Sequence, residues 1–315
     1  MSAVREIVVV GSVALDSVRT PAGERTAALG GSASFFSLAA CHYAPVRMVA
    51  VVGTDFPETN TALFRRRGID LAGLRTAPGK TFQWEGVYTE DMNDRTTVRT
   101  DLNVFLDFHP ELPVSYLNTP CVFLANIDPI LQAEVLDQLH APAVVMLDTM
   151  NYWITSKRDA LLSVLRRAQV CLFNDVEAKL LTGADNVLKA AEGIRMMGPS
   201  LVVIKRGEHG SLARTEQGWF SLPAYPLEAP QDPTGAGDAF AGGLMGFLAR
   251  RGGILDEQVV RLGLAHGTAV ASFAVERFSV EGLVEINAGM IQERVRHLWE
   301  ISRFEPDLPE VGGGR

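Results

Sequence analysis

Residues 232–238 read Asp-Pro-Thr-Gly-Ala-Gly-Asp, and a run of small and apolar residues, 239–250, follows directly. A glycine-rich turn therefore opens a helix. Gly235 and Gly237 allow positive φ and bring successive N–H groups close to an anion, while the helix start adds about half a positive charge. Pro233 biases the preceding residue toward extended backbone, as at a strand-to-helix corner. The pattern predicts a phosphate site at the start of a helix.

Asp238 is the unusual residue of this turn, because a carboxylate repels phosphate. One interpretation is that Asp238 only favours the helix dipole. The other is that it acts as a general base: it takes a proton from an attacking hydroxyl while the glycine turn stabilises the charge on the phosphoryl group. The second interpretation predicts phosphoryl transfer to a hydroxyl.

Two other phosphate-binding motifs fail on single residues. Gly79-Lys80-Thr81 resembles the end of a P-loop, but Leu74 stands where the P-loop needs glycine. The dinucleotide fingerprint would need a third glycine at Phe240, and only Gly11-Ser12-Val13 follows the first strand. A Rossmann dehydrogenase is therefore not expected.

Composition narrows the class of protein. With 315 residues and 47% hydrophobic content, the chain can bury a large core in one elaborated α/β domain or in two domains. No run reaches transmembrane length and no signal peptide precedes the first strand, so we expect a cytoplasmic protein without a membrane partner. A formal charge of −8 argues against nucleic-acid binding. Cys41, Cys121 and Cys171 lie far apart in apolar stretches, which favours reduced, buried thiols.

Strand and helix patterns alternate along most of the chain. Strands are expected at 7–10, 47–52, 121–125, 144–147, 170–173 and 201–205, and helices near 32–42, 56–67, 129–140, 157–167, 175–182 and 186–197. The spacing predicts a parallel sheet covered on both faces. Two stretches, 13–28 and 81–108, break the alternation and are expected to form antiparallel strands apart from this sheet. The chain after 236 is largely helical, and 304–315 is expected to be a disordered tail.

Three further segments lie at strand ends or helix starts. Gly30-Gly31 opens a helix, either where backbone must approach a polar ligand or as a plain sharp turn. Asn174 and Glu177 follow a strand, where they can orient water around Mg²⁺ or form a capping box. Residues 205–210, Lys-Arg-Gly-Glu-His-Gly, end another strand and either offer cations and backbone to a nucleotide or form a β-turn.

The order of these segments closely resembles the ribokinase-like (PfkB) carbohydrate kinases over residues 5–300, and 232–238 is the most specific element. The resemblance implies a three-layer α/β/α fold with a central, mainly parallel sheet and a small β lid over the substrate. The lid would be formed by 13–28 and 81–108. One kinase domain spanning 1–303 is therefore expected.

The resemblance also implies roles for individual residues. Asp238 matches the catalytic base, and the N–H groups of Gly235, Ala236 and Gly237 match the anion hole. The residues that match the ATP site are Lys205, Gly207, Gly210 and His266, and Asn174 and Glu177 match the motif that organises Mg²⁺ through water. Asp16 matches the carboxylate that binds sugar hydroxyls, with Gly30 and Gly31 beside it, and Asp232 and Thr234 match part of a monovalent-cation loop that would take K⁺.

The substrate is less determined. Many sugar-specific members carry an Asn where Phe35 stands, so one polar contact is lost. The lid region holds aromatic residues, Phe82, Trp84, Tyr88, Phe105 and Phe108, which either stack on a nucleobase or serve hairpin packing or a dimer contact.

We expect an ATP-dependent kinase of a small sugar or sugar derivative, with a nucleoside as the alternative substrate and a homodimer through the lid. A non-catalytic nucleotide- or sugar-binding sensor is the alternative from another class. Asp238 argues against the sensor, because an uncharged residue would serve phosphate binding better.

Overall fold

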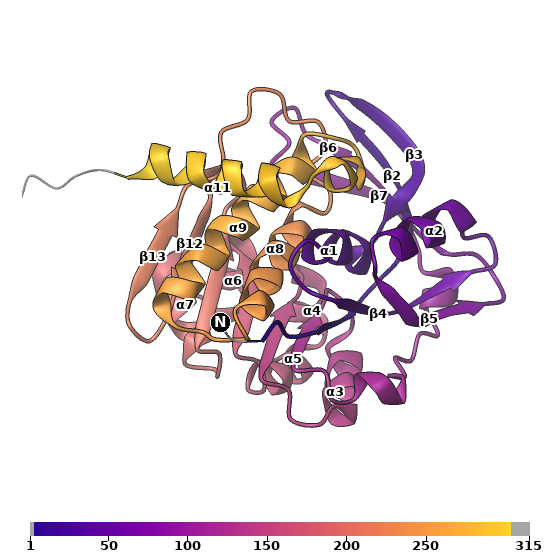
Figure 1. Ribbon diagram of the computed structural model, residues 1–315, viewed down its shortest axis with the longest axis horizontal. Helices are drawn as coiled ribbons and strands as arrows, with labels where there is room; N and C mark the ends of the chain where they lie inside the picture. The colour runs from indigo at the N-terminus through magenta and orange to yellow at the C-terminus, as the bar shows by residue number, and fades with distance from the viewer. Residues whose placement is uncertain (1–2, 304–315) are drawn as a thin grey trace, which may run out of the picture.

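The main sheet of the computed structural model, which describes residues 3–303, has nine strands in the order β13-β12-β11-β10-β9-β8-β1-β4-β5 (Figure 1). The parallel strands are β1 (Ile7–Val10), β4 (Val46–Gly53), β5 (Asp70–Ala77), β8 (Cys121–Leu124), β9 (Val144–Asp148), β10 (Val170–Asn174) and β11 (Leu201–Lys205). Two antiparallel strands, β12 (Ser211–Arg214) and β13 (Trp219–Leu222), complete one edge. The predicted, mainly parallel sheet is confirmed.

Helices cover both faces of this sheet. Ile7 and Val9 belong to one hydrophobic core, and Val8 and Val10 belong to the other, which explains the continuous apolar strands. The helices on the first face, in front of the sheet in Figure 1, are α1 (Ser32–Ala40), α8 (Ala236–Arg250), α9 (Glu257–Val275), α10 (Glu281–Glu285) and α11 (Ala288–Ser302), and α2 (Glu58–Arg66) lies beside β5. Those on the second face are α3 (Pro129–Gln138), α4 (Asn151–Ser156), α5 (Arg158–Leu165), α6 (Asp175–Thr182) and α7 (Val187–Arg195).

A second, four-stranded sheet stands at the upper right of Figure 1 and is called the lid below. Its order is β3 (Gly23–Gly30), β2 (Ala14–Thr20), β6 (Phe82–Tyr88) and β7 (Arg95–Asp101). The two predicted antiparallel hairpins are present, and they join through a parallel pairing of β2 with β6. The two stretches that broke the β/α alternation therefore form one structural unit.

Some elements were not predicted. β5 is only partly buried and carries Asp70, Arg75 and Thr76, so it lacks the apolar run of the central strands. The short edge strands β12 and β13 were also missed, as were the 3₁₀ turns η1 (Asn103–Phe105), η2 (Val114–Tyr116) and η3 (Gly207–His209). The tail expected at 304–315 lies outside the described residues.

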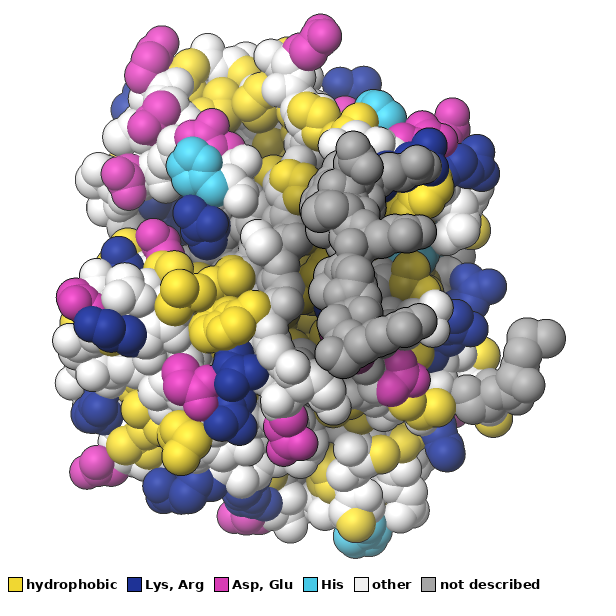
Figure 2. Space-filling view, turned by 90° about the vertical axis from the view of Figure 1, so that its left-hand side faces the viewer, with side chains coloured by type: hydrophobic (Ala, Val, Ile, Leu, Met, Phe, Trp, Pro, Cys, Tyr) yellow, Lys and Arg dark blue, Asp and Glu magenta, His cyan; other side chains and the backbone are white. Residues whose placement is uncertain are grey.

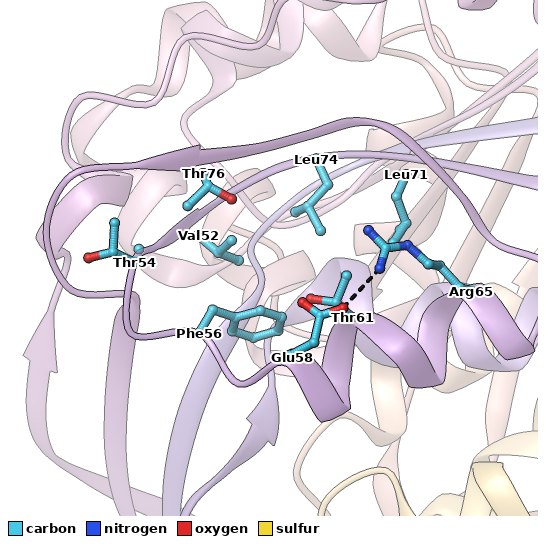
Figure 3. Close-up of a pocket in the computed structure, with 10 residues that line it drawn as sticks. Val52, Thr54, Phe56, Glu58, Thr61, Arg65, Leu71, Leu74 and Thr76 are labelled. Atoms are coloured by element: carbon cyan, nitrogen blue, oxygen red, sulfur yellow. Dashed lines mark hydrogen bonds and ion pairs between the residues drawn. The ribbon is translucent and has the colours of Figure 1, made fainter.

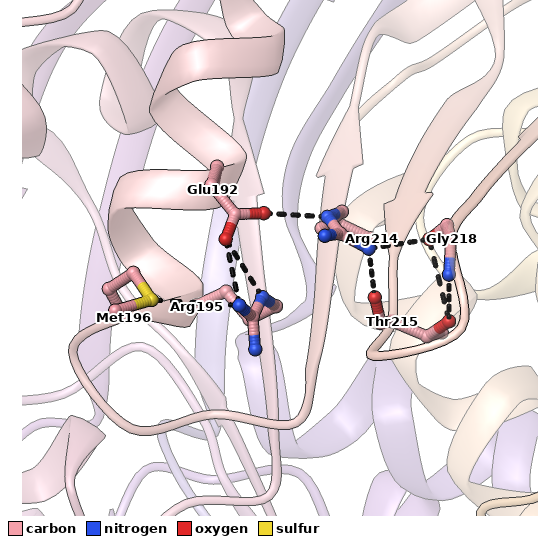
Figure 4. A network of polar contacts seen from close by, with 6 residues as sticks. All are labelled: Glu192, Arg195, Met196, Arg214, Thr215 and Gly218. Atoms are coloured by element: carbon pink, nitrogen blue, oxygen red, sulfur yellow. Dashed lines mark hydrogen bonds and ion pairs between the residues drawn. The ribbon is translucent and has the colours of Figure 1, made fainter.

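An ion-pair network ties the antiparallel edge to α7 (Figure 4). Glu192 accepts hydrogen bonds from Arg195 Nη2 at 2.8 Å and from Arg214 Nε at 2.6 Å. These bonds lower the pKa of Glu192 to about 2. Arg214 also donates to the carbonyls of Thr215 and Gly218, so one side chain joins α7 to the β12–β13 turn.

The surface carries charges of both signs, and the three cysteines are free. On the face shown in Figure 2, Lys and Arg side chains are interspersed with Asp and Glu side chains. Within residues 3–303, no helix combines the length and the apolar character needed to cross a bilayer. Cys121 and Cys171 are buried and Cys41 is partly buried, and all three are free thiols, as predicted.

Candidate active site

The glycine turn before α8 has the predicted positive φ at Gly235 but not at Gly237, which lies within the helix. Gly235 adopts a φ of 74° at the N-cap of α8, and Asp238 lies in the first turn of this helix. A Cβ atom on Gly235 would lie 2.3 Å from Cγ of Phe35, so the ring also excludes a side chain there. Glycine is therefore required at this position for two separate reasons.

Phe35 does not have the free ring that a substrate contact needs. Its side chain is 2% exposed and belongs to the core between α1 and α8. The expected role in substrate binding is corrected: the buried ring of Phe35 packs against Gly235 of the glycine turn. Its apolar neighbours on α1 explain the burial, because every residue of this helix is buried.

Lys205, at the end of β11, lies under the same turn. Its Nζ donates a hydrogen bond to Asp148 Oδ2 at 2.8 Å, and a Cβ on Gly237 would lie 3.1 Å from Nζ. Asp148 ends β9 and is 4% exposed. Sequence reasoning missed Asp148, although a carboxylate directly after the apolar run 144–147 marks the carboxyl edge of the sheet.

Asn174 and Glu177 form both hydrogen bonds of a capping box on α6. The Glu177 amide donates to Asn174 Oδ1 and the Asn174 amide donates to Glu177 Oε2, each at 2.7 Å. The capping interpretation is thus present in the structure. Burial raises the pKa of Glu177 to about 7, and the charge of Asp148 adds to this while that of Lys205 opposes it. The Glu177 carboxyl therefore shares the electrostatic environment of the Lys205–Asp148 pair.

Asp16 lies on the lid strand β2 beside the glycine pair. It is 7% exposed, and its Oδ2 accepts a hydrogen bond from the Gly31 amide at 3.4 Å. A Cβ on Gly30 would lie 1.9 Å from this oxygen, so only glycine fits beside the carboxylate. The structure therefore brings Asp16, Gly30 and Gly31 together, as the resemblance implied.

Asp238 and Asp16 both have raised pKa values. Burial raises the pKa of Asp238 to about 7, and the carboxylate of Asp148 adds to this. Burial also raises the pKa of Asp16 to about 7, and Asp232 and Asp238 contribute repulsion. A carboxyl whose pKa lies near neutrality can both accept and release a proton at physiological pH.

The loop before the turn is fixed by Asp232, which is 1% exposed. Its two carboxylate oxygens accept hydrogen bonds from the amides of Thr234, at 2.9 Å, and Ser279, at 3.0 Å. Thr234 Oγ1 donates to Tyr88 Oη of the lid at 3.1 Å. The loop thus contacts both the lid and the segment after α9.

Residues 206–210 form a tight turn after β11. The His209 amide donates to the Arg206 carbonyl at 3.0 Å, and Gly207 and Gly210 have φ of 54° and 82°. The β-turn is therefore observed, and the two glycines supply its left-handed conformations. The lid reaches this turn as well, because Asn93 Nδ2 donates to Glu208 Oε1 at 3.1 Å.

The structure does not bring His266 to the site. Its Nδ1 lies 3.0 Å from Tyr43 Oη, and its ring stacks on Phe247 at 4.4 Å between centroids. Phe247 is about two and a half helical turns along α8 from Asp238. Burial lowers the pKa of His266 to about 4, which fits a neutral ring in the helix layer. These contacts place His266 away from Asp238, and its expected position near the nucleotide stays a prediction.

Nothing in residues 3–303 forms a direct metal centre: no cluster of three or more His, Cys, Asp or Glu side chains is arranged to hold an ion. A cavity of about 260 Å³ opens elsewhere, between α2 and the ends of β4 and β5 (Figure 3). An ion pair of 2.9 Å between Glu58 and Arg65 stands at its side, and none of the carboxylates described above lines it.

Residues 4–286 match the model of the pfkB family of carbohydrate kinases. The chain belongs to this family. A cytidine kinase of Thermococcus kodakarensis is 34% identical over 271 residues, which is 84% of this chain and 95% of that protein. An aminoimidazole riboside kinase of Salmonella typhimurium is 33% identical over 108 residues, 34% of this chain and 33% of that protein.

Solved structures share the fold of this pfkB-family chain. A nucleoside kinase of Burkholderia thailandensis in complex with inosine gives a TM-score of 0.76 at 20% identity, covering 95% of this chain and 100% of that one. A fructokinase of Vibrio cholerae with bound fructose and ADP gives 0.74 at 16% identity, covering 93% and 99%. The ribokinase-like three-layer fold is thereby confirmed, and the chain is a phosphotransferase that acts on a hydroxyl group of a small molecule.

Proposed function

We propose that this protein transfers the γ-phosphoryl group of ATP to a hydroxyl of a nucleoside. The observation that carries the proposal is the position of Trp84 in the lid. Trp84 pairs with Asp16 in the parallel ladder of β2 and β6, so both side chains belong to the same face of the lid. A sugar offers hydroxyls to Asp16, whereas a nucleoside adds a flat base for an indole ring to stack on.

The ring of Trp84 is well placed to act as a platform. A Cβ on Gly86 would lie 2.1 Å from the Trp84 ring, so the indole occupies the space above this glycine. Its Nε1 lies 3.3 Å from Thr97 Oγ1, which fixes the orientation of the ring. The cytidine kinase of Thermococcus kodakarensis, which matches most of this chain, supports a nucleoside substrate over a free sugar.

Asp238 is proposed as the general base. It takes the proton of the substrate hydroxyl, the hydroxyl oxygen forms a bond to the γ-phosphorus, and the bond to the β-phosphate oxygen breaks to release ADP. The N–H groups of Gly235, Ala236 and Gly237 stabilise the charge on the transferred group. Asp16 accepts hydrogen bonds from two vicinal hydroxyls of the ribose.

The remaining assignments concern the nucleotide and the ions. Lys205, Gly207 and Gly210 are proposed to contact ATP, and Asn174 and Glu177 to hold waters of Mg²⁺, which would neutralise phosphate charge when bound. Asp232 and Thr234 are proposed to border a K⁺ site.

We also propose that the protein forms a homodimer through the lid and is located in the cytoplasm. The exposed strand β7 of the lid supports the dimer.

The test is an ADP-release assay of the full chain with Mg-ATP over cytidine, inosine, ribose and fructose, with the product identified by mass. We expect turnover with at least one nucleoside and much weaker turnover with the free sugars. Trp84→Ala should then raise KM for the nucleoside about tenfold or more, the scale of one lost stacking contact. If the protein phosphorylates only sugars, and Trp84→Ala does not change that turnover, the nucleoside proposal is wrong and the protein is a sugar kinase.

A further inference from the structure

The turn between β6 and β7, residues 89–94, is called the tip of the lid. The tip and Tyr88 beside it contact the loop before the catalytic turn and the turn after β11. Tyr88, the last residue of β6, accepts a hydrogen bond from Thr234 next to the catalytic turn, at 3.1 Å. Asn93 donates to Glu208 in the turn after β11, also at 3.1 Å. The tip of the lid therefore spans the distance between the general base and the proposed nucleotide loop.

Arg95 is the first residue after this tip and lies opposite Tyr88 in the ladder of β6 and β7. Its guanidinium carbon lies 5.6 Å from the centre of the Trp84 ring. The charge of Arg95 lowers the pKa of Asp16, Glu177 and Asp238 alike. One lid cation thus acts on the hydroxyl-binding residue, the proposed metal position and the base.

The donors of Arg95 are not engaged by these carboxylates. Within the described part of the chain, no carboxylate lies within ion-pairing distance of its guanidinium. Arg99, on the same strand, differs in this respect, because its Nε lies 3.4 Å from Asp101 and 3.8 Å from Glu85. Arg95 donates a side-chain hydrogen bond to the Tyr88 hydroxyl. Its other N–H donors remain for an anion, in a region where Asp16, Glu177 and Asp238 would otherwise repel one.

We propose that Arg95 binds the γ-phosphoryl group during its transfer, so that the lid supplies a catalytic residue as well as a cover. Its fork of N–H groups suits two oxygens of a phosphoryl group, and its charge offsets the repulsion from Asp16 and Asp238. This inference rests on the kinase reaction proposed above, but it does not depend on which acceptor is used.

The first test measures nucleotide binding without an acceptor. Isothermal titration of the full chain with Mg²⁺ and β,γ-imido-ATP, and separately with ADP, compares the wild type with Arg95→Ala. We expect the variant to bind the triphosphate analogue about tenfold or more weakly and ADP within about twofold, because only the former carries a γ-phosphate. Arg99→Ala is the matched control on the same strand and should leave both affinities unchanged. Equal weakening of both nucleotides, or of neither, would overturn the proposal.

The second test measures turnover with any acceptor that the wild type phosphorylates. Arg95→Ala should lower kcat by about 10²-fold or more, and Arg95→Lys should recover only part of this loss, because it keeps the charge without the fork. Added guanidinium ion should partly restore Arg95→Ala and leave Arg99→Ala unaffected.

A merely structural role for Arg95, stacking on Trp84, predicts a lower melting temperature with no response to guanidinium. That result would contradict the proposal. A wild type that phosphorylates no nucleoside would refute the proposed substrate alone, because the binding test still decides the role of Arg95.

Discussion

Nζ of Lys205 lies 2.8 Å from Oδ2 of Asp148, and the two residues end β11 and β9, the strands on either side of β10. Asp148 raises the pKa of Lys205 against the effect of burial, so the pair keeps the lysine charged beneath Gly237. A buried ion pair at this position holds a cation ready beside the anion-binding turn.

Removing one partner of this pair should be costly. Asp148→Asn should lower the free energy of unfolding by about 2 kcal/mol, because Lys205 keeps a buried charge without its counter-ion. Urea unfolding of Asp148→Asn, Lys205→Met and the double variant gives a double-mutant cycle. We expect a coupling energy of about 1 kcal/mol or more between the two positions, and strict additivity would contradict a functional pair.

Asp238→Asn should retain nucleotide binding and lose turnover by about 10²-fold or more, the usual scale for a general base. Asp256→Ala is the control, because Asp256 caps α9 by accepting from the Val259 amide at 2.9 Å. That variant should lose about 1 kcal/mol of stability and keep normal turnover. Near-normal kcat in Asp238→Asn would remove Asp238 from the proposed role.

The contribution of three buried carboxyls to stability should fall as pH rises from about 4 to 7, whereas the lowered pKa of His266 acts in the opposite direction. The pKa values of Asp16, Glu177 and Asp238 are raised to about 7 in the folded protein, against 3.8 or 4.5 for the unperturbed groups. These three groups therefore bind more protons in the folded state within this window, and their deprotonation favours unfolding. Asp238→Asn should be more stable than the wild type at pH 8, by about 1–3 kcal/mol, and similar to it near pH 4. Urea unfolding at both pH values checks this.

The same shift governs activity, because a general base must be ionised. The value of kcat/KM should rise with pH through about 7, the raised pKa of Asp238. Arg95→Ala should move this limb to higher pH, since the guanidinium lowers the pKa of Asp238. A profile that is flat between pH 5 and 8 would contradict the assignment.

Gly235→Ala should destabilise the protein more than Gly183→Ala. Both glycines have positive φ, 74° and 71°, but a Cβ on Gly235 meets the Phe35 ring at 2.3 Å, whereas a Cβ on Gly183 meets nothing within 4 Å. Gly183→Ala therefore measures backbone strain alone, about 1 kcal/mol. Gly235→Ala should cost about 2 kcal/mol or more and also lower turnover. Equal losses of stability in the two variants, measured by thermal unfolding, would mean that the Phe35 ring can shift at no cost.

Glu177→Gln separates the capping role from the metal role. If Glu177 holds waters of Mg²⁺, the variant should need more Mg²⁺ for half-maximal turnover while its free energy of unfolding changes by no more than about 1 kcal/mol. Asn186→Ala is the control, because Asn186 caps α7 by accepting from the Lys189 amide at 3.0 Å. A Glu177 variant that melts early and turns over normally in saturating Mg²⁺ would support capping alone.

The sequence predicted the central strands well because each is an uninterrupted apolar run, as in β1 and β10. It missed β5, where exposed polar residues break the run. At the site, the glycines were identifiable because their backbone needs are local. Phe35 and His266 were assigned by position along the chain, whereas burial against α8 decides what each ring can touch. Arg95 gave no signal, because its proposed role depends on the pairing of lid strands that lie far apart in the sequence.

The parallel pairing of β2 with β6 makes the lid a poor candidate for a single hinge. The chain crosses between the lid and the main sheet four times: after β1, before α1, after β5 and after β7. Any rotation of the lid must bend all four connections together, so we expect the lid to move as a single rigid body. A single cut in the exposed segment between β5 and β6 would leave three connections and both hairpins intact, and the cleaved protein should keep its lid.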